Sequence, residues 1–167
     1  PLMHQSMRHV AQVRRSLGVP TIFNLLGPLC NPANATHQLL GVGKPSLRPM
    51  MADALLRLQT KHAVVVCGAD GLDEVTLTGT TRVCEVTPDN IKGYDINPGE
   101  MGLPVTGSEN LKGGSAEENA GLLKSILFGG KGPQRDVVLL NAAAALVAGN
   151  IADSLSQGLE IAADSID

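Results

Sequence analysis

The segment Ala63–Cys67, with the sequence AVVVC, constrains the fold of this chain most strongly. A continuous apolar and largely β-branched run of this length is typical of a strand that is buried on both faces of a sheet. An apolar segment at Gln38–Val42 comes before it, and the residues from Ser46 to about Thr60 have the spacing of a helix. Strand, helix and buried strand form a βαβ unit, so we expect the two strands to be parallel.

The predicted helix after Ser46 is expected to begin at that serine, which can act as an N-cap. Its inward face is predicted to hold four apolar side chains, Leu47, Met51, Ala54 and Leu58. Beyond the buried strand, short segments are separated by Gly79-Thr80 and by the turn residues 88–90. They predict hairpins that extend the sheet with antiparallel strands, over Glu74–Thr78, Arg82–Thr87 and Ile91–Ile96.

Helices are predicted at both ends of the chain. Residues 4–17 have helical spacing, and Gly18 followed by Pro20 ends that helix. Ser115 and Glu118 form a capping box for a helix that runs to Gly129-Gly130. Pro133 suits the first turn of the next helix, which runs to about Gly149, and Asp153 or Ser154 caps the last one. With no internal repeat and no linker, residues 1–167 are expected to form a single α/β domain fragment in which helices flank a partial mixed sheet.

Composition narrows the possible functions. Hydrophobic residues make up 43% of the chain and charged residues 17%, which is typical of a globular protein. Aromatic residues make up only 2% and the net charge is −3, so a base-stacking nucleic-acid partner is not expected. Three widely spaced cysteines favour neither a disulfide framework nor a zinc site. No signal peptide or membrane-spanning run is apparent, so we expect a cytoplasmic protein without a membrane partner.

Two neighbouring carboxylates, Asp73 and Glu74, follow the buried strand in the segment GADGLDEVTLTG. Ligands bind at the carboxyl ends of strands in open α/β sheets. Adjacent side chains point to opposite faces within a strand, so the two carboxylates can converge only on a loop, which Gly68 and Gly71 would supply. Paired carboxylate oxygens suit Mg²⁺. A solvated turn is the alternative interpretation of the pair.

The segment Val13–Ala33 is too apolar for a solvent loop and too interrupted by Gly and Pro for one helix. It contains two adjacent arginines, Arg14 and Arg15, beside apolar positions of a predicted helix. A guanidinium held at the edge of a site could pair bidentately with a carboxylate, although two solvated side chains are the alternative. Gly27-Pro28 marks a turn whose backbone can approach a flat ligand.

Together these two segments resemble the anthranilate phosphoribosyltransferase family, over essentially all of the chain. The resemblance implies a nucleoside phosphorylase/phosphoribosyltransferase-like fold, called class IV among phosphoribosyltransferases. It also implies transfer of a 5-phosphoribosyl group from phosphoribosyl pyrophosphate (PRPP) to anthranilate, in tryptophan biosynthesis, by an enzyme that uses Mg²⁺ and is a homodimer at full length. Positioning and charge stabilisation would carry most of this reaction, with little covalent work by the protein.

The resemblance also implies roles for particular residues. Asp73 and Glu74 would bind Mg²⁺, and Arg14 would meet the anthranilate carboxylate. Gly27 and Pro28 would lie against the anthranilate ring. His4 matches a histidine beside that ring, although the family pattern His-Pro-Ala-Met is here His4-Gln5-Ser6-Met7. Pro20 stands where many members of the family have arginine.

The family's GTGGD loop and its KxGN segment do not occur in this sequence. In the family that loop holds pyrophosphate through backbone N–H groups. We therefore expect a C-terminal portion that is inactive by itself. Two alternatives stay open: a catalytically silent module that binds a ligand or a partner, and a related phosphoribosyltransferase or phosphorylase acting on a nucleobase.

Overall fold

A computed structural model describes residues 13, 16–19 and 21–167 of the chain. Two compact units divide the chain, Pro1–Thr36 and His37–Asp167. In the first unit, helix α2 (Ile22–Leu26) leads directly into the 3-10 helix η1 (Gly27–Leu29). Most of the helix predicted over residues 4–17 lies outside the described residues. Its described positions 13, 16 and 17 are helical, and Gly18 follows with a φ of +63°.

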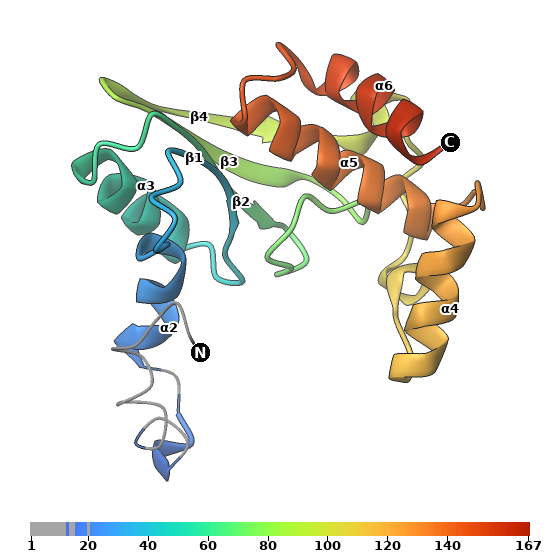
Figure 1. Cartoon of the computed structure of the whole chain (residues 1–167), viewed down its shortest axis with the longest axis horizontal. Coiled ribbons are helices and arrows are strands. Elements are labelled where there is room, and N and C mark those ends of the chain that lie inside the picture. Colours follow the sequence, from blue (N-terminus) through green and yellow to red (C-terminus); the bar gives the residue numbers. More distant parts are fainter. Residues whose placement is uncertain (1–12, 14–15, 20) are drawn as a thin grey trace. The chain divides into compact units, whose positions relative to one another are not determined.

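The second unit is built on a four-stranded mixed sheet with the order β1-β2-β3-β4 (Figure 1). Strands β1 (His37–Gly41) and β2 (His62–Gly68) are parallel, and Leu39 lies opposite Val64. Strands β3 (Thr81–Thr87) and β4 (Asn90–Ile96) continue the sheet in antiparallel pairing, joined by a turn at Pro88 and Asp89. These strands confirm the predicted βαβ unit, the hairpin and the mixed sheet.

The segment Glu74–Thr78 is not a strand, so that prediction is wrong. Its alternating pattern resembles a strand, but side chains take over the hydrogen bonds that a neighbouring strand would make. Thr81 Oγ1 accepts the N–H of Thr76 at 2.9 Å, and Asn141 binds both backbone groups of Val75. The segment is therefore a loop at the end of the sheet.

Helix α3 (Leu47–Arg57) connects β1 to β2 and packs on one face of the sheet. Its Arg48 donates to the Cys84 sulfur at 3.4 Å, so α3 lies on the face that carries Cys84. The predicted inward face is wrong in part, since the buried side chains are Met51, Ala52 and Leu55, while Leu58 follows the last helical turn and is exposed. Ser46 has helical φ and ψ and its side chain makes no capping hydrogen bond, contrary to the prediction.

The chain then runs through two short 3-10 helices, η2 (Pro98–Met101) and η3 (Ser108–Leu111), to three α-helices. These are α4 (Ala116–Leu127), α5 (Pro133–Ala148) and α6 (Leu155–Ile166). The predicted capping box is confirmed, because Ser115 accepts from Glu118 N–H and Glu118 accepts from Ser115 N–H. Pro133 occupies the first turn of α5, and Ser154 rather than Asp153 caps α6 by accepting the Gln157 N–H at 3.2 Å.

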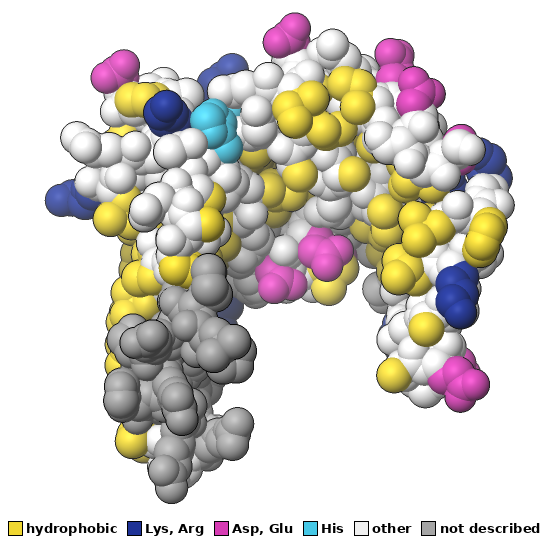
Figure 2. Space-filling view, in the orientation of Figure 1, with side chains coloured by type: hydrophobic (Ala, Val, Ile, Leu, Met, Phe, Trp, Pro, Cys, Tyr) yellow, Lys and Arg dark blue, Asp and Glu magenta, His cyan; other side chains and the backbone are white. Residues whose placement is uncertain are grey.

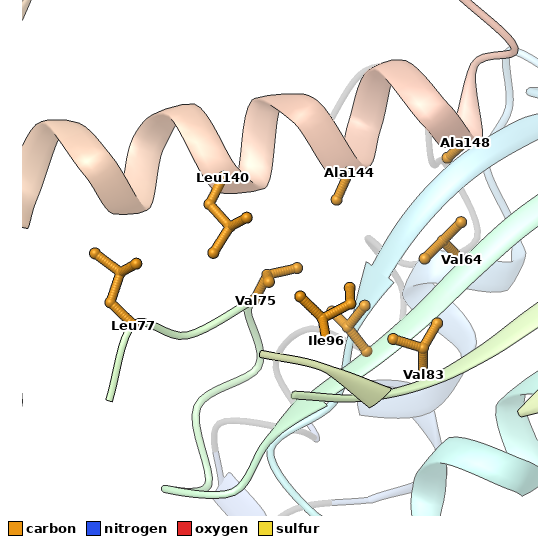
Figure 3. Packing of buried hydrophobic residues seen from close by; sticks show 9 residues of the cluster. Val64, Val75, Leu77, Val83, Ile96, Leu140, Ala144 and Ala148 are labelled. Carbon is orange, nitrogen blue, oxygen red and sulfur yellow. The ribbon is translucent and has the colours of Figure 1, made fainter. Parts of the chain in front are cut away.

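The core of this unit lies between the sheet and α5 (Figure 3). Val64 and Val66 of β2 share one face of their strand, because alternate residues point the same way. They pack with small and aliphatic side chains of α5 and with the loop that follows β2, a cluster completed by Val75, Leu77, Val83, Ile96, Leu140, Ala144 and Ala148. Helix α6 packs against α5. Among the described residues, the helices lack the combined length and apolar character needed to cross a bilayer.

Candidate functional site

The loop Gly68–Thr80 leaves the carboxyl end of β2 through a tight turn. Gly68 N–H donates to the Leu72 carbonyl at 2.9 Å, and Gly71 N–H donates to the Gly68 carbonyl at 3.0 Å. Gly71 has a φ of +86°, a left-handed conformation that glycine adopts without steric cost. This turn allows Asp73 and Glu74, which follow it directly, to leave the alternating geometry of a strand.

Asp70 is the internal anchor of this loop. Its Oδ2 accepts from the hydroxyls of Thr76 at 2.7 Å and Thr78 at 2.5 Å, and its Oδ1 accepts the Leu72 N–H at 3.0 Å. Burial raises the pKa of Asp70, but the hydrogen bonds from Thr78, Thr76 and Leu72 outweigh it and hold the pKa below its ordinary value. Both oxygens of the Asp70 carboxylate therefore accept hydrogen bonds from the loop itself.

Asp73 and Glu74 are exposed and line one pocket of about 380 Å³. We call it the acidic pocket; its other lining residues are Leu39, Gly41, Val66, Val137, Val138 and Asn141. Figure 2 shows acidic side chains beside hydrophobic ones at the loop that follows β2. Both residues lie on a loop, as the sequence predicts, and both line this pocket.

Two neighbours hold the acidic residues against the body of the unit. A Cβ added to Gly41, the last residue of β1, would overlap the Asp73 carbonyl group and lie 3.1 Å from Asp73 Cα. On the other side, Asn141 of α5 hydrogen-bonds to the backbone of Val75, the residue after Glu74. The sequence alone predicts a place in the site for neither residue. Gly41 lies in the interior of a predicted strand, where an isolated glycine can mark a close backbone approach.

The residues present fit Mg²⁺ as a partial ligand set. Within the described part of the chain, no group of three or more His, Cys, Asp or Glu side chains could enclose a metal. The acidic pocket therefore offers two carboxylates and no more of these side chains. Mg²⁺ is commonly held in this way, by one or two carboxylates together with water and substrate phosphates.

The other predicted site residues lie in the first unit or outside the described residues. His4 and Arg14 are outside them, as is Arg15. Gly27 and Pro28 are both exposed, and their predicted turn is the 3-10 helix η1, in which Cys30 N–H donates to the Gly27 carbonyl at 3.3 Å. Gly27 has helical φ and ψ, so no left-handed turn requires glycine there.

His62 lies at the opposite end of β2 and is part of a separate polar cluster. Its Nδ1 is 2.6 Å from Asn150 Oδ1, and its Nε2 is 2.9 Å from Glu85 Oε1. Asn150 has a φ of +56° and follows Gly149, the C-cap residue of α5. Both ring nitrogens are used within the fold, which gives His62 a structural role.

Comparisons with known proteins agree with this architecture. A protein-family model described as "Glycosyl transferase family, a/b domain" matches residues 1–167. The curated anthranilate phosphoribosyltransferase of Desulfitobacterium hafniense (strain DSM 10664 / DCB-2) is 52% identical over 164 residues, covering 98% of this chain and 49% of that protein. The chain thus spans about half the length of the curated relatives it matches.

Solved structures of the same enzyme share the fold. The crystal structure of anthranilate phosphoribosyltransferase from Thermus thermophilus matches with a TM-score of 0.88 and 46% identity, covering 98% of this chain and 48% of that chain. Two structures of the Saccharomyces cerevisiae enzyme, one in complex with PRPP and Mg and one with 4-fluoroanthranilate, each match with a TM-score of 0.86 and 31% identity. Each match covers 98% of this chain and slightly under half of the yeast chain. The expected phosphoribosyltransferase-like fold is confirmed, and the chain belongs to the glycosyl transferase family whose a/b domain it matches.

Proposed function

We propose that this chain supplies the metal-binding and acceptor-binding part of an anthranilate phosphoribosyltransferase. In this proposal residues 1–167 are part of a single α/β domain, and the whole enzyme transfers the 5-phosphoribosyl group of PRPP to the amine of anthranilate. The observation that carries it is the acidic pocket, which Asp73 and Glu74 both line beyond the carboxyl end of a buried strand that pairs in parallel with β1. The relatives named anthranilate phosphoribosyltransferase support it through identities of about half the residues.

In the proposed reaction, Asp73 and Glu74 would hold Mg²⁺. When bound, the metal ion would neutralise negative charge that develops on the leaving pyrophosphate. The protein's own contribution is geometric, since Gly41 and the Asp70-anchored turn fix where the two carboxylates lie. The yeast relative was solved with PRPP and Mg, which supports a metal of this kind.

The acceptor is proposed to bind at residues of the first unit. Arg14 would pair with the anthranilate carboxylate, Gly27 and Pro28 would lie against the ring, and His4 would stand beside it. The yeast complex with 4-fluoroanthranilate supports an aromatic acceptor. We also propose a cytoplasmic location, since three unpaired thiols suit a reducing compartment, and a homodimer for the full-length enzyme.

The test uses this chain joined to the N-terminal segment that the resemblance implies, which we call the restored enzyme. Asp73→Asn combined with Glu74→Gln should raise the Mg²⁺ concentration needed for half-maximal turnover by at least about tenfold, because charge-assisted contacts are each worth roughly 1.5–3 kcal/mol. The KM for anthranilate should stay nearly constant. Asp89→Asn, which removes an exposed carboxylate from the β3–β4 turn, is the matched control. Superimposable Mg²⁺ titrations of the parent and the double variant would show that the acidic pair is only a solvated turn.

A further inference from the structure

The side chain of Asn141 hydrogen-bonds to Val75, the loop residue that directly follows the acidic pair. Its Oδ1 accepts the Val75 N–H at 2.9 Å, and its Nδ2 donates to the Val75 carbonyl at 2.8 Å. The same Nδ2 donates to the Val137 carbonyl at 2.9 Å, within α5. Both amide hydrogens are therefore used, so Asn141 lines the acidic pocket without a free donor to offer a ligand.

This contact replaces a strand ladder. Glu74 and Val75 belong to no strand, and among the described residues the backbone of Val75 hydrogen-bonds to Asn141 alone. The Val75 N–H belongs to the peptide unit shared with Glu74, and the Val75 carbonyl belongs to the peptide unit shared with Thr76. The amide side chain of Asn141 therefore holds the peptide units on both sides of Val75. The next residue, Thr76, is fixed separately by Thr81 and Asp70.

The side chain of Val75 points the other way, into the core. It is fully buried and packs in the same cluster as Leu140, the neighbour of Asn141 on α5 (Figure 3). Backbone and side chain of Val75 are thus both held by α5. Glu74, which directly precedes this fixed residue, is exposed and lines the pocket.

We propose that Asn141 is a positioning residue, whose side-chain amide sets the directions of Asp73 and Glu74 and thereby the affinity of the acidic pocket for a divalent cation. The inference rests on the metal-binding role proposed above. The hydrogen bonds from Asn141 on α5 and the close approach of Gly41 from β1 hold the pair from two sides. Groups that orient metal ligands in this way typically change metal affinity by about 10- to 100-fold when they are removed.

Binding of Mn²⁺ to the 167-residue chain, followed by the electron paramagnetic resonance signal of free Mn²⁺, tests the proposal. Asn141→Leu keeps the side-chain size and removes all three hydrogen bonds. We expect it to weaken Mn²⁺ binding by about tenfold or more. In the background Asp73→Asn with Glu74→Gln, the same change should have almost no further effect on Mn²⁺ binding, because the groups that it positions are gone.

Asn150→Ala is the matched control for loss of stability. It removes an asparagine that also hydrogen-bonds through its amide, and it places alanine at a φ of +56°. It should lower Tm and leave Mn²⁺ affinity unchanged, because Asn150 does not line the acidic pocket. Amide hydrogen exchange of Val75 gives a second readout, since its protection should fall in Asn141→Leu and not in Asn150→Ala.

The outcomes separate the two proposals. If the double variant of Asp73 and Glu74 binds Mn²⁺ more weakly than the parent and Asn141→Leu does not, the positioning role is overturned and the metal site stands. If the parent and the double variant bind Mn²⁺ equally, the metal role fails and the inference falls with it. Should Asn141→Leu fail to fold, Asn141→Gln keeps the amide one methylene farther out, and an unchanged Mn²⁺ affinity in that variant would equally overturn the proposal.

Discussion

Replacing Gly41 with alanine should displace the acidic pair without touching either carboxylate. Gly41 is the last residue of β1, and its backbone lies close against the backbone of Asp73. A methyl group there would overlap the Asp73 carbonyl and lie 3.1 Å from Asp73 Cα, whereas ordinary contacts begin at about 3.4 Å. The obstacle is backbone on both sides, so no side-chain rotation can relieve it, and the loop must move away from the strand.

Overpacking of this kind costs roughly 1–3 kcal/mol of unfolding free energy. For a chain of this size that corresponds to a fall in Tm of about 2–12 °C. The same displacement moves Asp73 relative to Glu74, so Mn²⁺ binding to the acidic pocket should weaken together with stability. Differential scanning calorimetry and Mn²⁺ titration of the same preparations measure both effects.

Gly43→Ala is the matched control, two residues farther along the chain. A Cβ at Gly43 would lie 3.5 Å from the Gly71 carbonyl oxygen, an ordinary contact. It should change Tm and Mn²⁺ affinity little. Equal behaviour of Gly41→Ala and Gly43→Ala in both measurements would refute the packing of Asp73 against β1.

Three further predictions address the loop, the helices and the acceptor. Because the pKa of Asp70 is lowered in the folded state, its stabilisation is complete above its ordinary pKa of 3.8 and is lost as the pH falls through the folded value. Asp70→Asn should therefore lower Tm at neutral pH by the equivalent of about 1 kcal/mol, and the difference from the parent should shrink in acid; a difference independent of pH would contradict the anchor role. Gly158→Ala would place a Cβ 2.9 Å from Ala143 Cα, so thermal melts should show a loss of about 1–3 kcal/mol from α5–α6 packing, and an unchanged Tm would contradict that contact. In the restored enzyme, Arg14→Ala should raise the KM for anthranilate about ten- to hundredfold and Arg15→Ala little, because the sequence predicts a helix there and only one of two adjacent residues of a helix can face the site; the reverse order would overturn the assignment.

Much of the fold follows from local signals in the sequence. The β-branched run at Ala63–Cys67 predicts the buried strand, and β2 is buried throughout its length. The capping box of Ser115 and the proline at position 133 place two helix starts, because both signals act within one helical turn. Such features depend on neighbours in the chain, which the sequence displays directly.

The sequence-based predictions are wrong where contacts with residues far away in the chain determine the local structure. Glu74–Thr78 has the pattern of a strand, but its hydrogen-bond partners include Asn141, which is 66 positions along the chain from Val75. Helix α3 turns Met51, Ala52 and Leu55 inward because the sheet beneath it selects the face. The position of the acidic pair on a loop was predictable, since the pair follows a buried strand. The residues that hold it, Gly41 and Asn141, are recognisable only once β1 and α5 are placed beside the loop.

The rate of anthranilate consumption in the presence of PRPP and Mg²⁺ tests the central claim most directly. It should be measured for the restored enzyme, for its variant with Asp73→Asn and Glu74→Gln, and for the 167-residue chain alone. We expect turnover by the restored enzyme, a large loss in the variant and no measurable turnover by the chain alone, because the loop that would hold pyrophosphate is absent from this sequence. Robust turnover by the purified chain alone, or a restored enzyme that consumes a nucleobase and leaves anthranilate untouched, would contradict the account.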